Sequence, residues 1–117
     1  MKMFVTMNMT FEVNLESNQI DMLKMIVEDF LANQSAEIVD EIPAKNVKYE
    51  YNMNHWKIKE KIMKAFVKME INFEVDLDCL KVSDIQSTVD GFLAKEVHDL
   101  IDEIQGQNVK VEYNMNH

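Results

Sequence analysis

The chain contains the same pattern twice. When the sequence is shifted by 62 positions, residues 1–55 align with residues 63–117 without a gap, and about 25 of the aligned pairs are identical. The run at 51–55 recurs unchanged at the end of the second copy. Two copies are too few for a solenoid, which buries its core by stacking three or more repeats. The repeat therefore predicts one domain, 1–117, whose two halves share a core and are joined by a linker at 56–62.

Each copy is predicted to be a strand, a helix and a second strand. Apolar and polar residues alternate along 3–15 and again along 65–77, which is the period of a strand with one buried and one exposed face. Apolar residues then recur at every third or fourth position, as in a helix that packs on one side. Shorter alternating runs at 47–53 and 109–115 close the two copies as strands. Every predicted strand thus has one apolar face that needs a cover.

The resulting order, β-α-β-β-α-β, predicts the fold. Right-handed crossovers make the two strands of each copy parallel. The long strands then lie antiparallel at the centre of a four-stranded antiparallel sheet, and both helices cover the same face. This is a two-layer, α+β, ferredoxin-like sandwich. We expect the first helix to end before Pro43 and the second at Gly106, in the left-handed conformation. The rival is a strand-swapped homodimer.

Composition narrows the classes of partner. The formal net charge is −9, and all twelve cationic side chains are lysines. Such a chain is poorly suited to binding nucleic acid or anionic lipid, both of which need a basic surface. No apolar run approaches the roughly 18 residues of a membrane-spanning helix. Cys79 is the only cysteine, and we expect a packed thiol in a reducing, cytoplasmic compartment.

Residues for catalysis or metal binding are scarce. The chain has two glycines, which excludes a glycine-rich phosphate loop. No serine or cysteine has a histidine at a spacing that would activate it as a nucleophile. His55 and His117 are repeat equivalents expected at opposite sheet edges, and His98 is expected to be solvated, so no zinc-ligand spacing exists. We therefore expect neither an enzyme nor a metal site, and no cofactor.

Carboxylates crowd the outward positions of both predicted helices. They are Asp21, Glu28, Asp29, Glu37, Asp40, Glu41, Asp84, Asp90, Glu96, Asp99, Asp102 and Glu103. Such a face is often plain solvated surface, but carboxylates on rigid helices also imitate the charge of DNA and can occupy a basic protein channel. Small acidic inhibitors of phages and mobile elements, including anti-CRISPR proteins, use this strategy. The pattern favours a non-catalytic inhibitor or adaptor whose partner is a protein with a basic surface.

Two other functions stay open. Two-fold-related β-α-β units often bind metabolites where they meet, which favours a small-ligand regulatory domain. Alternatively, Phe4 and Phe66 point outward among polar neighbours on the central strands and could anchor a structural homo-oligomer through the open sheet face. The same aromatics could stack on RNA bases, but Glu12 and Glu70 share that face and would repel phosphates. Direct nucleic-acid binding is therefore not expected.

Overall fold

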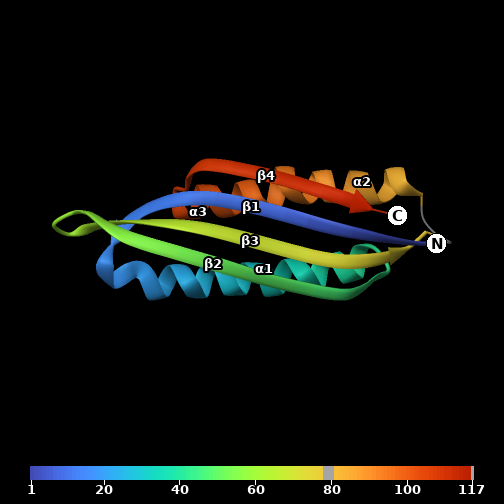
Figure 1. Cartoon of the computed structure of the whole chain (residues 1–117), viewed down its shortest axis with the longest axis horizontal. Helices are drawn as coiled ribbons and strands as arrows, with labels where there is room; N and C mark the ends of the chain where they lie inside the picture. The colour runs from blue at the N-terminus through green and yellow to red at the C-terminus, as the bar shows by residue number, and fades with distance from the viewer. Residues whose placement is uncertain (78–80, 117) are drawn as a thin grey trace.

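The computed structural model describes residues 1–77 and 81–116, which build one sheet with helices on one face (Figure 1). The strands are β1 (Lys2–Glu16), β2 (Ala44–Lys59), β3 (Ile62–Asp76) and β4 (Gln107–Asn116). The helical segments are η1 (Ser17–Gln19), α1 (Ile20–Glu41), α2 (Val82–Gly91), η2 (Phe92–Glu96) and α3 (Val97–Ile104). The strand order is β2-β3-β1-β4, and all neighbours are antiparallel. The predicted ferredoxin-like sandwich is confirmed.

The core lies between the two central strands and the helices. The inward residues of β1 and β3 are buried, as the period-two pattern predicts, except Met63 at the start of β3, which is half-buried. They are Met3, Val5, Met7, Met9, Phe11, Val13 and Leu15 of β1 with Ala65, Val67, Met69, Ile71, Phe73 and Val75 of β3. Asn8 lies opposite Glu70, which is its own repeat equivalent. The pseudo-two-fold axis that relates the copies therefore passes between these two residues.

The edge strands are covered less completely than their sequence pattern predicts. Tyr49, opposite Ile71, and Val111, opposite Met9, lie on the helix side of the sheet. Yet they are 47% and 43% exposed, so the helices cover the edge strands only in part. Tyr51 still ties β2 to α1, since its hydroxyl donates a hydrogen bond to Glu28 Oε1 at 2.5 Å.

Most residues of the predicted linker at 56–62 lie in strands. Residues 56–59 continue β2 and Ile62 begins β3, so the two copies are joined by a hairpin with Glu60 and Lys61 at its tip. Trp56 lies opposite Lys64, on the open face of the sheet. Trp56 and Ile58 alternate with Lys57 and Lys59, as in a strand, but in the opposite phase to Tyr51 and Met53. Within this structure both copies pair inside one chain, rather than in the swapped arrangement.

The two helical layers differ although their sequences align without a gap. α1 is uninterrupted, whereas α2 and α3 are connected by a π-helical segment, η2, which begins directly after Gly91. The second helix ends at Gln105, which takes the left-handed conformation with φ 56°, and not at Gly106 as predicted. Gly106 is needed for space instead, because a Cβ there would lie 3.0 Å from the Cδ1 atom of Ile101.

Candidate binding groove between the helices

The helices carry all twelve carboxylates that the sequence singled out. Eleven are exposed and Glu96 is half-buried. Several hold local structure, since Glu28 accepts a hydrogen bond from Tyr51 and Asp84 accepts one from the Lys81 backbone amide. Asp102 lies 3.5 Å from His98 Nε2. The set therefore does not form one patch, and the structure divides it into a groove and its flanks.

Two contacts between equivalent residues connect the helical layer across the pseudo-two-fold axis. The rings of Phe30 and Phe92 lie 6.2 Å apart between centroids. The Gln34 amide nitrogen donates a hydrogen bond of 3.4 Å to Glu96 Oε2. Because α1 and α2–α3 run in opposite directions (Figure 1), these contacts meet at the middle of the layer and leave space on either side.

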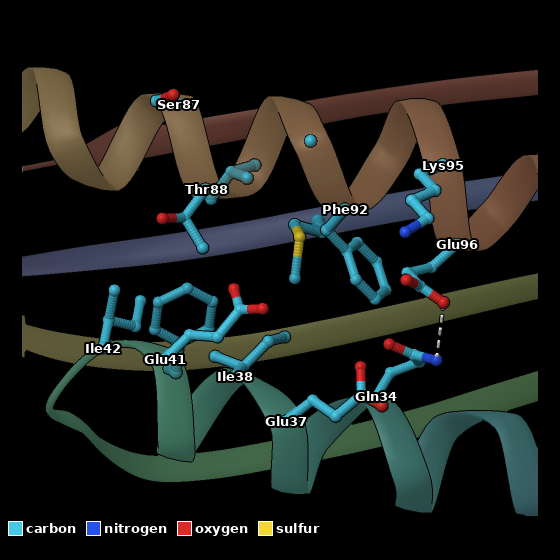
Figure 2. Close-up of a pocket in the computed structure, with 14 residues that line it drawn as sticks. Gln34, Glu37, Ile38, Glu41, Ile42, Ser87, Thr88, Phe92, Lys95 and Glu96 are labelled. Carbon is cyan, nitrogen blue, oxygen red and sulfur yellow. Dashed lines mark hydrogen bonds between the residues drawn. The ribbon is translucent and has the colours of Figure 1, made fainter.

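Each side of these contacts holds a cavity. The first, here called the Lys95 cavity, has a volume of about 260 Å³ (Figure 2). Its lining residues are Met7, Gln34, Glu37, Ile38, Glu41, Ile42, Phe73, Ser87, Thr88, Val89, Gly91, Phe92, Lys95 and Glu96. The second, the Asn33 cavity, has a volume of about 320 Å³. Its lining residues are Ile26, Asp29, Phe30, Asn33, Gln34, Glu96, Asp99, Leu100 and Glu103.

The two cavities are images of each other under the repeat. Glu37 and Glu41 of the Lys95 cavity correspond to Asp99 and Glu103 of the Asn33 cavity. The opposite walls have diverged, because Thr88, Gly91 and Lys95 stand where the first copy has Ile26, Asp29 and Asn33. Six of the twelve predicted carboxylates line the two cavities: Asp29, Glu37, Glu41, Glu96, Asp99 and Glu103. We call the two cavities together the acidic groove.

Hydrogen-bond acceptors outnumber donors in the Lys95 cavity. Gln34 is only 8% exposed, and its Oε1 atom accepts no hydrogen bond from any described residue. The Thr88 hydroxyl is already used, since it donates to the Asp84 carbonyl oxygen at 3.1 Å. Buried acceptors are normally satisfied, and leaving one unpaired costs about 1–3 kcal/mol. The Gln34 oxygen thus lacks a donor among the described residues, although Ser87 and Lys95 also line the cavity.

Sequence reasoning missed the buried polar residues of the groove. Gln34 and Ser35 are both buried, and Ser35 Oγ also lacks a hydrogen-bond partner among the described residues. The signal was present, because position 34 follows Leu31 by three residues and precedes Ile38 by four. That spacing places Gln34 on the buried face of the helix.

The open face of the sheet keeps its two aromatics apart. Phe4 is 51% exposed and Phe66 is half-buried, and both lie on the face away from the helices. Phe66 lies opposite Glu12 on β1, eight residues from Phe4, which corresponds to about 27 Å along an extended strand. The two side chains therefore do not form one apolar anchor.

A pair of carboxylates lies at the centre of the open face. Glu50 of β2 lies opposite Glu70 of β3. The hydrogen bond that protonated Glu70 donates to Glu50 raises the pKa of Glu70 above its usual value. Partial burial and repulsion from Glu50 raise this pKa further, and Lys68 and Asn72 oppose the rise. In the other half the equivalent of Glu50, which is Glu112, lies opposite Asn8 instead.

The remaining candidate residues stay separate from the groove. His55 on β2 and His98 on α3 are exposed. Cys79 and His117 lie outside the described residues. Within residues 1–77 and 81–116, no three His, Cys, Asp or Glu side chains gather closely enough to hold a metal ion. No helix in this part of the chain combines the length and the apolarity needed to cross a membrane.

Comparison with known proteins identifies the fold and no family. No protein-family model and no curated protein matches the sequence. Among solved structures, a Staphylococcus aureus protein named as an aminohydrolase matches with a TM-score of 0.57 and 11% identity, over 99% of this chain and 31% of that one. A Burkholderia vietnamiensis amidase of the hydantoinase/carbamoylase family matches with a TM-score of 0.56 and 11% identity, over 98% of this chain and 28% of that one. The chain thus spans under a third of these proteins, and such identities show the fold alone.

Proposed function

We propose that this protein is a non-catalytic binding module whose acidic groove receives a basic segment of a partner protein, so that it acts as an inhibitor or adaptor. The observation that carries the proposal is the groove itself. Six carboxylates line it, and the Lys95 cavity adds an apolar floor and the buried Gln34 oxygen, which accepts no hydrogen bond from a described residue. Of the described residues that line it, only Lys95 is a cation.

Electrostatics favour a cationic partner over any other. The whole chain has a charge of −9, and clefts lined by one sign of charge concentrate the field and speed the arrival of opposite charges. Complementary charge also selects against wrong partners. Protein surfaces that bind nucleic acid carry such cations. The proposal therefore includes imitation of DNA, as by phage-type and anti-CRISPR-like inhibitors. A cytoplasmic location belongs to it as well, since the single cysteine allows no internal disulfide.

The hydrolase names of the matched structures add nothing to this proposal. Their whole chains are more than three times as long, and the likeness is one of fold. A homo-oligomer joined through Phe4 and Phe66 is less well supported, because those side chains lie far apart on the open face. The small-ligand alternative keeps one supporting observation, which is the Lys95 cavity at the junction of the two repeats.

The test compares two variants with the same net charge. Both carry four neutralising substitutions, which change the charge from −9 to −5. The groove variant is Glu37→Gln, Glu41→Gln, Asp99→Asn and Glu103→Gln. The sheet-face variant is Glu50→Gln, Glu70→Gln, Glu74→Gln and Glu112→Gln. Binding of a fluorescent peptide of about ten arginines and lysines is measured by anisotropy in about 50 mM and about 500 mM NaCl.

We expect the groove variant to lose most of the binding and the sheet-face variant to keep it. We also expect high salt to weaken binding to the unmodified protein, because exposed charges are screened. Equal losses in the two variants would show that only net charge matters. Binding that is absent, or insensitive to salt, would refute the proposed electrostatic recognition.

A further inference from the structure

The Lys95 cavity has the size of a single side chain. Its volume of about 260 Å³ is below the roughly 300–1,000 Å³ of pockets that hold drug-sized ligands. The floor is apolar, formed by Met7 and Phe73 of the sheet together with Ile38 and Phe92 of the helices. An occupant therefore needs an aliphatic or planar body that can lie against these residues.

The polar groups at the mouth of the cavity favour an occupant that donates hydrogen bonds. Figure 2 shows the Gln34 amide nitrogen turned toward Glu96 and its oxygen on the side of the cavity. Glu41 extends from α1 into the same space, toward α2 (Figure 2). The unpaired Gln34 oxygen and the carboxylates of Glu37 and Glu41 can all accept hydrogen bonds and donate none when ionised. An occupant with several N–H groups and a positive charge would satisfy them together.

We propose that the Lys95 cavity recognises one arginine side chain of the basic partner. A guanidinium is planar, always charged and carries five N–H donors in a fixed fork, which suits several acceptors at once. Its methylene stem can cover the apolar floor, and its plane can stack on the Phe92 ring. This inference rests on the proposed function and names the side chain by which the cavity recognises the partner.

The differences between the two cavities explain why we assign the arginine to the Lys95 cavity and not to the Asn33 cavity. Gly91 replaces Asp29, and nothing lies within 4 Å of where a Cβ would stand at Gly91, so the wall is open there. The Asn33 cavity has more carboxylates, but the Gln34 oxygen points to the other side and the residues of the sheet do not line it. Lys95 is exposed at the rim, where its charge opposes a cation and tunes the affinity.

The probes are acetyl-Gly-Arg-Gly-amide and its lysine and citrulline analogues, titrated into the isotope-labelled full chain and followed by backbone amide NMR. Citrulline keeps the shape of arginine without its charge, and lysine keeps the charge without the fork. We expect arginine to bind more tightly than lysine and citrulline to be weakest. Shifts should concentrate at residues lining the Lys95 cavity. Equal affinity for arginine and citrulline, or shifts confined to the sheet face, would overturn the proposal.

Matched variants locate the contact. We expect Glu41→Gln to weaken arginine binding about tenfold, as for the loss of one charge-assisted hydrogen bond. Its repeat equivalent, Glu103→Gln, removes the same charge from the Asn33 cavity and should weaken binding less than about threefold. Gln34→Leu should also weaken binding, and Lys95→Gln should strengthen it about twofold. Equal effects of Glu41→Gln and Glu103→Gln, or weaker binding by Lys95→Gln, would contradict an arginine site.

The two proposals fail in different ways. If the long basic peptide binds the groove but the arginine tripeptide binds no better than citrulline, the arginine cavity is wrong and the basic partner stands. If the tripeptide binds as described but the long peptide binds the groove variant as tightly as the unmodified protein, the arginine cavity stands. The groove as a whole is then not the surface that receives a basic segment.

Discussion

Neutralising Glu70 should stabilise the protein. Glu50 and Glu70 are opposite one another on neighbouring strands, where side chains leave the backbone about 5 Å apart. Like charges in such a pair cost up to about 1 kcal/mol on an exposed sheet face. We therefore expect Glu70→Gln to raise the free energy of unfolding by about 0.5–1 kcal/mol at pH 7. In a chain of this size that corresponds to a rise in Tm of about 2–6 °C.

The pH dependence of this gain follows from the raised pKa of Glu70. A carboxyl whose pKa is raised by folding contributes stability below its ordinary pKa of about 4.5, and this contribution is lost as the pH rises through the folded value. The gain from Glu70→Gln should therefore be complete at pH 7 and vanish near pH 3, where both carboxyls are protonated. Urea denaturation followed by circular dichroism at the two pH values measures it.

The second repeat-related site provides the control. Glu112→Gln changes the net charge by the same amount, from −9 to −8, but Glu112 lies opposite Asn8 and so loses no carboxylate neighbour. We expect it to change stability by less than about 0.3 kcal/mol. The converse change, Asn8→Glu, places a carboxylate between Glu70 and Glu112 and should destabilise the fold. A gain from Glu70→Gln that persists at pH 3, or that Glu112→Gln reproduces, would refute the reasoning.

Four further substitutions test the packing and one hydrogen bond. Gly91→Ala should stabilise the fold by about 0.5–1 kcal/mol, because the position is helical and open. Gly106→Ala should destabilise the fold, because its Cβ would crowd a neighbouring isoleucine. Thermal melts compare the two variants. Phe92→Ala should lower the free energy of unfolding, measured in urea, by roughly 3 kcal/mol, since the ring is 93% buried and contacts the opposite helix. A loss below about 1 kcal/mol would mean that the helices do not depend on this contact. The hydrogen bond to Glu28 raises the pKa of Tyr51 above 10.0, so Glu28→Gln should lower the midpoint of one tyrosine in an ultraviolet titration; an unchanged midpoint would contradict the contact.

The fold could be predicted from the sequence because its signals are long and repeated. Strict alternation over 3–15 and 65–77 identifies two one-sided strands, and the right-handed crossover leaves few ways to assemble them. The same rule would have ended β2 near Met53, because Trp56 and Ile58 alternate with lysines in the opposite phase. The stretch was predicted as a linker because the repeat alignment leaves 56–62 between the two copies, whereas 56–59 continue β2 and Ile62 begins β3.

The acidic groove could be predicted only in part. Helical spacing placed the carboxylates on the helices, but the cavities depend on how far apart the helices lie. That separation follows from the side chains at the crossing point, Phe30 and Phe92, and not from periodicity. The π-helical segment after Gly91 likewise has no signature in an alignment without gaps. The unpaired oxygen of Gln34 is a property of packing, which no local pattern of residues encodes.

The repeat has a consequence for how a ligand lies on this protein. If the two copies had the same sequence, the groove would present the same features to a chain that enters from either end, and a bound segment would have no preferred direction. The exchange of Ile26, Asp29 and Asn33 for Thr88, Gly91 and Lys95 removes that equivalence. Divergence of the groove residues after duplication, at these three positions and at others such as Gln34 and Glu96, thus gives the surface two different ends.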